Sequence, residues 1–159
     1  MTDAAAGERG ANVHFPPPLV FVAFTLLGVL LRYVAGPIPL PAALWARLLG
    51  VGVLVAGGAI VLSARTHFVR THQHPAPWKP TPELILGGPY RFTRNPMYLG
   101  ITCVQIGLGV ALANLWIALL APLALLTVHV IAVLPEERYL AEKFGSSYRQ
   151  YCATVRRYL

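Results

Sequence analysis

The chain alternates between long apolar segments and shorter polar ones, and the apolar segments fall into two pairs. A proline-rich turn at 36–41 separates the first pair, because proline cannot continue a helix. In the second pair no charged residue occurs from Ile101 to Leu134, a run too long for one bilayer span of roughly 20 residues. Asn114 divides this run into an antiparallel hairpin. The pattern therefore predicts four transmembrane helices, at about 17–35, 44–64, 96–113 and 115–134.

Three polar segments flank these helices. Residues 1–15 lack the apolar region and cleavage site of a signal peptide, so we expect a disordered leader. The connection 65–95 is basic and rich in proline, which predicts an ordered loop against the lipid headgroups. After Pro135 the pattern predicts two helices separated by Gly145, the second amphipathic with tyrosines at helical spacing. We expect residues 16–159 to form a single domain.

The low content of charged residues indicates an all-α integral membrane protein. Charged residues make up 12% of the sequence and hydrophobic residues 56%, whereas an ordinary soluble domain carries about 25% charged residues. The net charge is +7, but the basic residues lie beside apolar segments and no nucleic-acid-binding motif is present. This argues against a nucleic-acid partner. The histidines of the loop 65–95 have no cysteine or carboxylate at ligand spacing, so we expect no metal site.

The distribution of lysine and arginine predicts the orientation in the membrane. The N-terminal segment has one, the loop 65–95 five and the C-terminal segment five, against two around the first short turn and none at Asn114. Positive residues stay on the cytoplasmic side, so we expect both termini and the loop in the cytoplasm. The excess of arginine over lysine and the abundance of alanine suggest a bacterial inner membrane. The central stretch Leu86–Gly100 and the pair Glu136-Glu137 then share one membrane face.

The residue types on this face suit a charged organic ligand. Arg91 and Arg94 suit a carboxylate or phosphate, and Asn95-Pro96 is a helix start whose free N–H groups favour anions. The two glutamates suit hydroxyls, an ammonium group or a metal, while tyrosines suit an aromatic base or a cation. S-adenosylmethionine carries a carboxylate, an ammonium, a ribose diol, an adenine and a sulfonium, and so matches these residues in type.

Two motifs carry a resemblance to a known family. The segment 88–100, GPYRFTRNPMYLG, resembles the GPYRxxRHPxYxG motif of integral membrane methyltransferases. The pair Glu136-Glu137, followed by Phe144-Gly145-x-x-Tyr148-x-x-Tyr151, resembles the tail that follows that motif. The family is that of isoprenylcysteine carboxyl methyltransferase and the phospholipid methyltransferases. The resemblance covers roughly 68–159, whereas the first two helices resemble the family only in being hydrophobic.

The resemblance implies S-adenosylmethionine-dependent methyl transfer to a lipid-like or small amphiphilic acceptor, on a carboxylate, amine or thiol. Asn95 stands where the motif shows histidine, so no proton-transfer role carries over to it. The residues implied to bind the cofactor are Gly88, Tyr90, Arg91, Asn95, Pro96, Tyr98, Glu136 and Glu137. The residues expected to act on the substrate or on a proton are Arg94, Glu137 and His129.

Other interpretations of the same residues stay open at this point. The arginines also suit membrane anchors, the glutamates ordinary first-turn acids, and the tyrosines packing at the interface. The whole chain also suits a non-catalytic membrane assembly protein on the same scaffold. A nicotinamide-dependent membrane reductase is a further alternative, because membrane sterol reductases have a similar C-terminal hairpin. The order of both motifs on one membrane face favours the methyltransferase.

Overall fold

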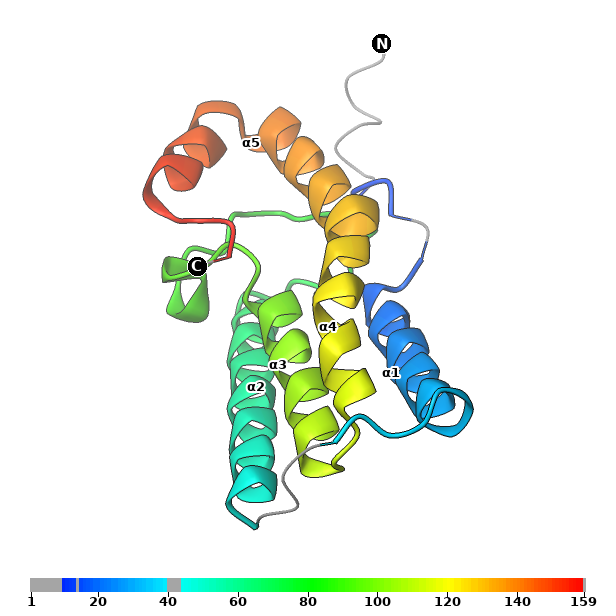
Figure 1. Cartoon of the computed structure of the whole chain (residues 1–159). Coiled ribbons are helices and arrows are strands. Elements are labelled where there is room, and N and C mark those ends of the chain that lie inside the picture. Colours follow the sequence, from blue (N-terminus) through cyan, green and yellow to red (C-terminus); the bar gives the residue numbers. More distant parts are fainter. Residues whose placement is uncertain (1–9, 14, 40–43, 159) are drawn as a thin grey trace.

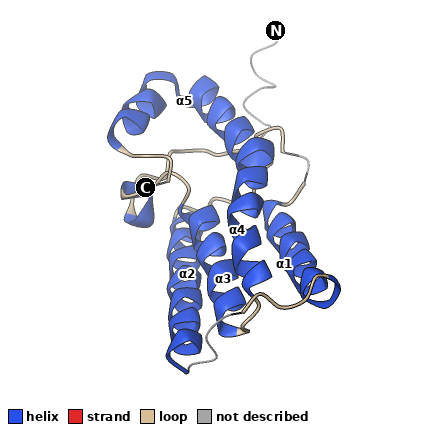
Figure 2. Ribbon diagram, viewed as in Figure 1, coloured by secondary structure: helices blue, strands red, loops and turns tan. Residues whose placement is uncertain are grey.

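Helices arranged side by side form the body of the protein, and irregular segments gather at one end of them (Figure 1). The computed structural model describes residues 10–13, 15–39 and 44–158, and it contains no strand within those ranges (Figure 2). The predicted helical class is therefore confirmed. The helices are α1 (Pro17–Val34), α2 (Leu44–Arg70), η1 (Gly88–Arg91), α3 (Pro96–Ala111), α4 (Leu115–Val128), η2 (His129–Val133) and α5 (Leu134–Thr154).

The bundle places α3 and α4 at its centre, with α2 packed on α3 and α1 on α4 (Figure 1). Within the described ranges, three helices are long and apolar enough to cross a bilayer: α1, α2 and the continuous helix Leu115–Thr154. The apolar helix α3 is shorter, with 16 residues. Leucine and valine side chains of α1 and α2 remain exposed, as expected of surfaces that face lipid.

The backbones of α2 and α3 touch because glycines of both helices face each other. A Cβ on Gly57 would lie 2.6 Å from the carbonyl oxygen of Gly100, and a Cβ on Gly107 would lie 2.4 Å from the nitrogen of Leu54. Small residues allow such close contact between apolar helices, which have little hydrophobic driving force in lipid. Gly52, by contrast, has nothing within 4 Å of its added Cβ. Some of the α2 glycines are thus packing residues, while others face outward.

We expect Gly107→Ala to separate α2 from α3, because the new methyl group overlaps main-chain atoms that cannot rotate away. The cost should be about 3 kcal/mol in unfolding free energy, measured by thermal unfolding in detergent. Gly58→Ala is the matched control, since nothing lies within 4 Å of its added Cβ. Equal melting temperatures for the two variants would contradict this account of the interface.

The second predicted helix ends later than expected, at Arg70 rather than residue 64. The expected loop therefore begins at 71. The helix terminates where His72 takes a positive φ of 53° and the N–H of Gln73 donates to the carbonyl of Phe68 at 2.8 Å. This is the usual left-handed end of a helix. Basic residues at 65 and 70 lie on the final turns of α2 and do not mark the start of a loop.

The fourth predicted helix does not stop at 134 but continues through a π turn into α5. In this turn the N–H of Leu134 donates to the carbonyl of His129, five residues back. Pro135 has no N–H to donate, and the wider turn just before it accommodates the missing hydrogen bond without ending the helix. The expected break at Gly145 is confirmed: its φ of 53° lies outside the helical region and bends α5 sharply (Figure 1).

Polar side chains tie α1 to the hairpin at the end of the bundle opposite the irregular segments. Asn114 Nδ2 donates to the carbonyl of Gly28 at 3.2 Å, and Arg32 Nη1 donates to the carbonyl of Ala113 at 2.5 Å. Asn114 occupies the N-cap position of α4, yet it makes no capping hydrogen bond there. Its side chain therefore fixes the position of α1 and leaves the first turn of α4 uncapped.

Part of the expected leader packs against the bundle. Residues 1–9 and 14 of it lie outside the described ranges, as do 40–43 of the first turn. The N–H of Ala11 donates to the carbonyl of Pro77 at 2.7 Å, and the side chains of Ala11 and Val13 are buried against α1 and α4. Residues 10–13 thus hold the segment around Pro77 over the end of the bundle.

Candidate active site

The central stretch turns sharply before α3 begins. Gly88 opens η1 with a φ of 58°, and a Cβ there would lie 2.1 Å from an atom of the His67 ring. His67 Nδ1 donates to the carbonyl of Ser63 at 2.8 Å, which holds this ring over Gly88. Position 88 therefore requires glycine for two reasons: its φ is positive, and the His67 ring leaves no space for a side chain.

The chain after α5 folds back onto the central stretch, so that its last described residues lie beside η1 (Figure 1). Val155 is extended, with φ −122° and ψ 128°, and ends the helix. The N–H of Arg94 then donates to the carbonyl of Arg156 at 2.9 Å, and the Thr93 hydroxyl donates to the carbonyl of Arg157 at 3.0 Å. Segments some 60 residues apart in sequence are thereby joined.

Asn95 contributes to the same junction. Its Nδ2 donates to the carbonyl of Arg157 at 3.1 Å. Asn95 stands at the N-cap position of α3, followed by Pro96 at the first helical position, as predicted. It makes no side-chain capping hydrogen bond, however, because its amide is committed to the C-terminal segment. The predicted helix start is correct, whereas the role of the Asn95 side chain differs from the prediction.

Glu137 lies between two arginines. Arg94 Nη1 is 3.1 Å from Glu137 Oε1, and it also donates to Cys152 Sγ at 2.8 Å. Arg157 binds the same carboxylate with two parallel hydrogen bonds, Nε to Oε1 at 2.9 Å and Nη2 to Oε2 at 2.7 Å. The Arg94 and Glu137 side chains are only 14% and 16% exposed, so this cluster is largely shielded from solvent. Paired, hydrogen-bonded charges of this kind fix one another's orientation.

Glu136 has no arginine partner among the described residues. Its Oε2 accepts one long hydrogen bond, at 3.5 Å, from the Tyr98 hydroxyl. Burial raises the pKa of the Glu136 carboxyl to about 7; the bond from Tyr98 lowers it, and the charge of Glu137 raises it further. Glu136 is thus the acid of the pair that a ligand can reach without breaking an ion pair.

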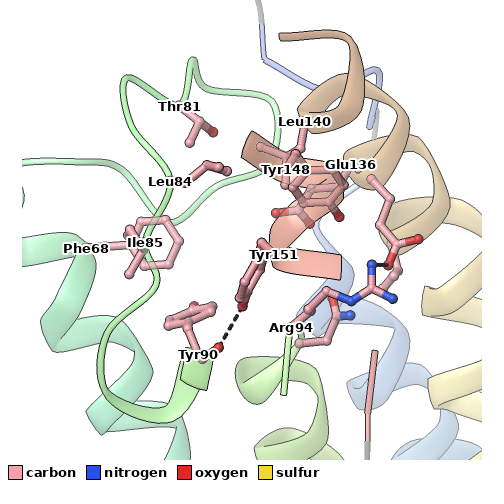
Figure 3. A pocket seen from close by; sticks show the side chains of 13 residues that line it. Phe68, Thr81, Leu84, Ile85, Tyr90, Arg94, Glu136, Leu140, Tyr148 and Tyr151 are labelled. Atoms are coloured by element: carbon pink, nitrogen blue, oxygen red, sulfur yellow. Dashed lines mark hydrogen bonds and ion pairs between the residues drawn. The ribbon is translucent and has the colours of Figure 1, made fainter. Parts of the chain in front are cut away.

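A small polar cavity lies between the loop after α2, η1 and the two halves of α5 (Figure 3). Its volume is about 70 Å³. Phe68 and Ile85 stand on one side of it and Arg94 on another, while Tyr151 donates to the carbonyl of Tyr90 at 2.7 Å (Figure 3). Its charged and hydroxyl-bearing lining residues are Thr81, Tyr90, Arg94, Glu136, Glu137, Tyr148 and Tyr151.

A larger apolar cavity of about 280 Å³ adjoins the polar one. Prolines at the start of α1, the segment 74–78 and the first turns of α3 form its walls, with Trp78, Met97 and Tyr98 among them. The residues that line both cavities form a shared wall: Phe68, Tyr90, Arg94, Asn95 and Glu136. A ligand in either cavity therefore meets the same charged groups.

The sequence also matches a family model. The model for the phospholipid methyltransferases matches residues 45–147, well over half of the chain. The chain belongs to the phospholipid methyltransferase family. No curated protein matches it. The matched range begins before the residues that carry the motif resemblance, so α2 is part of the family region, and membership implies methyl transfer at a membrane.

In this member of the phospholipid methyltransferase family, the structure brings two of the three residues expected to act to one cavity. Arg94 and Glu137 line the polar cavity. The expected cofactor-binding residues that line one or both cavities are Tyr90, Asn95, Pro96, Tyr98, Glu136 and Glu137.

Three expected site residues lie elsewhere. Gly88 supports the turn below His67 and lines neither cavity. The exposed Arg91 side chain lines a separate surface groove beside Gln150. His129 begins the π turn, where its Nδ1 lies 3.1 Å from the Tyr158 hydroxyl, and it too lines neither cavity. The structure therefore does not bring these three residues to the shared wall.

For the tyrosines of the tail the sequence left packing at the interface open as an interpretation, and in the structure Tyr148 and Tyr151 line the polar cavity. Their spacing of three residues in the tail motif places them on one helix face, which was the available signal. Burial raises the pKa of Tyr151 to about 12, and burial also raises the pKa of Tyr90 and Tyr148. At neutral pH these hydroxyls are protonated and act as hydrogen-bond donors.

The raised pKa of Glu136 predicts how stability depends on pH. The unfolded protein releases this proton near pH 4.5 and the folded protein only near pH 7, so the folded state binds more protons between these values. Stability of the cofactor-free protein should therefore fall by about 3 kcal/mol as pH rises from 4.5 through 7, and then level off. The change in stability is measured by thermal unfolding in detergent across this pH range, for the wild-type protein and for the variant Glu136→Gln. An identical slope in the variant would refute the assignment.

Proposed function

We propose that the protein transfers the methyl group of S-adenosylmethionine to a lipid-like or small membrane-partitioned acceptor at the cytoplasmic face of the membrane. The observation that carries the proposal is the shared wall, where Tyr90, Arg94 and Glu136 face both a polar and an apolar cavity. A charged cofactor and an apolar acceptor can meet only where two such environments adjoin. Family membership supports the reaction class.

The residues present fit the charged end of the cofactor. Its ammonium group suits Glu136, the acid without an arginine partner in the described part of the chain. Its carboxylate suits Arg94, whose buried Nε meets no acceptor among the described residues. The rings of Phe68, Tyr90 and Tyr151 suit the adenine. Because the polar cavity holds only about 70 Å³, the cofactor extends across the shared wall into the larger cavity.

In this proposal Glu137 positions Arg94 and Arg157 without itself binding the cofactor. Its carboxylate is already occupied by three short contacts from the two guanidinium groups. Such a cluster holds Arg94 in one orientation before a ligand arrives, which reduces the cost of ordering on binding.

When bound, S-adenosylmethionine supplies a methyl group on a positively charged sulfur. A lone pair of the acceptor forms the new bond to the methyl carbon as the carbon–sulfur bond breaks, and the electrons of that bond remain on sulfur. The protein contributes alignment and exclusion of water, for which the apolar cavity around Trp78 and Met97 is suited. Carboxylate and thiolate acceptors react as they stand, whereas an amine must first lose a proton.

We propose that α1, the first two thirds of α2, α3 and α4 with η2 all span the bilayer. At 1.5 Å per residue the 16 residues of α3 extend over about 24 Å, somewhat less than the roughly 30 Å of a hydrocarbon core. Local thinning or snorkelling flanks accommodate a helix of this length. The excess of arginine and lysine at the end that carries the cavities supports a cytoplasmic site, with both termini cytoplasmic, in a bacterial inner membrane.

Isothermal titration of the detergent-solubilised protein with S-adenosylmethionine tests the proposal directly. We expect a micromolar dissociation constant, and transfer of labelled methyl groups into a lipid or small-molecule fraction of membrane extracts. The fraction that becomes labelled would identify the acceptor class. Absence of both binding and label transfer, with a protein that melts cooperatively, would rule the proposal out.

A further inference from the structure

A second recess opens on the outside of the bundle, away from both cavities. This groove, of about 590 Å³, lies between α4 and the chain that follows α5. Its lower wall is apolar and consists of Pro122, Leu125 and Leu126. Leu126 is 58% exposed, so the wall is accessible from the side of the bundle, where the lipid tails of the proposed bilayer would lie. The groove shares no lining residue with the polar or the apolar cavity.

The upper rim of the groove is basic and polar. Arg156 is exposed and forms no ion pair with any described residue. Beside it, the Tyr158 hydroxyl lies 3.1 Å from His129 Nδ1, and the two rings pack with centroids 5.9 Å apart. The Arg157 guanidinium completes the rim; its side chain is 39% exposed although it also binds Glu137. The rim thus offers cationic and hydroxyl donors and contains no acid.

The order of these groups along α4 matches a phospholipid. Leu125 and Leu126 precede His129 by about one helical turn, roughly 5 Å, and Pro122 precedes it by about two turns, roughly 10 Å. Basic groups therefore lie at one end of the groove, at the level of lipid headgroups, and apolar side chains lie below them. Arginines near an apolar surface attract anionic lipids by the same combination of charge and burial.

We propose that this groove binds one anionic phospholipid of the cytoplasmic leaflet, with its phosphate on Arg156 and Tyr158 and an acyl chain along Leu125 and Leu126. The lipid is a resident one and not the methyl acceptor, because the groove is separate from the shared wall. The proposal depends on the bilayer placement given above but not on methyl-transfer chemistry.

Lipid in the groove would also stabilise the C-terminal segment. The carbonyl of Arg156 accepts a hydrogen bond from the Arg94 N–H at 2.9 Å, and the carbonyl of Arg157 accepts from Thr93 at 3.0 Å. A phosphate held by the side chains of Arg156 and Tyr158 therefore restrains the segment that is joined to residues 93–95. Bound lipid should therefore raise the melting temperature through mass action on the folded state.

The test uses the full chain in neutral detergent, titrated with phosphatidylglycerol or with phosphatidylcholine. We expect native mass spectrometry to show one retained phosphatidylglycerol, and the melting temperature to rise by about 5 °C, with a much smaller rise for phosphatidylcholine. Arg156→Gln, and separately Leu126→Trp, which fills the groove without changing charge, should each remove this rise.

Two matched controls separate a built site from general surface attraction. Arg149→Gln removes an exposed arginine of α5 outside the groove, and Leu119→Trp alters an exposed leucine of α4 two turns from Leu126. Both variants should show the full rise in melting temperature with phosphatidylglycerol. The proposal is overturned if Arg149→Gln weakens it as much as Arg156→Gln does, if both lipids act equally, or if inorganic phosphate alone gives the same rise.

Discussion

Glu136→Gln is expected to lower the rate of methyl transfer about 10- to 100-fold while leaving the protein equally stable, or more stable, above pH 7. Glutamine has nearly the same shape and can still accept the hydrogen bond from Tyr98. It cannot carry the negative charge that the cofactor's ammonium group needs, and a charge-assisted hydrogen bond is worth roughly 1.5–3 kcal/mol. Stability should not fall, because burial already opposes the charged form of this carboxyl.

Three measurements on one preparation of Glu136→Gln separate binding from folding. The initial rate with labelled cofactor and the calorimetric affinity for the cofactor should both fall. The melting temperature at pH 8 should not decrease. Glu142→Gln is the control, because Glu142 is an exposed acid on the same helix. A variant that loses activity and melting temperature together would show that Glu136 supports the fold and does not hold the cofactor.

Glu137→Ala, unlike Glu136→Gln, should lower the free energy of unfolding, by about 3–5 kcal/mol. The change leaves Arg94 and Arg157 close together without the carboxylate that pairs both, in surroundings where Arg94 is only 14% exposed. Removing one partner of a shielded charge cluster costs more than the cluster contributes while intact, since the remaining charges have neither partner nor water. Activity should be lost as well, because Arg94 is no longer held in place.

A double-mutant cycle identifies the source of this loss. Glu137→Gln, Arg157→Gln and the double variant are compared by thermal unfolding, with Glu142→Ala as the surface control. We expect the double variant to be less destabilised than the sum of the single changes by 1 kcal/mol or more, as for groups in direct contact. Additive effects would mean that the 2.7 Å contact between Arg157 and Glu137 contributes no coupling energy.

Much of the helical frame follows from the sequence because membrane spans are long, apolar and free of charge. The starts of α1, α2, α3 and α4 agree with the predicted positions within a residue. The predicted end of α2 was wrong. Charged residues mark the membrane boundary, whereas the helix continues beyond it to Arg70 and ends where His72 takes a positive φ. The predicted break between α4 and α5 was also wrong. A π turn before Pro135 joins the two helices, and such a turn leaves no mark in the pattern of apolar residues.

The residues that line the candidate cavities were predictable in part, but their internal pairing was not. The two motifs pointed to Arg94 and to both glutamates, and these do line one cavity. Nothing in the sequence distinguishes Glu136 from Glu137, since adjacent residues on a helix point about 100° apart and only tertiary contacts decide which meets an arginine. The return of Arg157 to the central stretch was likewise invisible, because it depends on an extended Val155 after a helix that could have continued.

The contacts between residues 93–95 and 156–157 make the junction beside η1 one of the last parts of the fold that can form during synthesis. Chains emerge from the ribosome N-terminus first, so α1 and α2 can enter the membrane before Arg157 has been translated. The carbonyl groups of Arg156 and Arg157 that accept from Arg94, Thr93 and Asn95 are then still missing. Insertion can therefore begin before this junction exists, and a chain truncated before residue 156 should enter the membrane but lack the arginine that binds Glu137 with two hydrogen bonds.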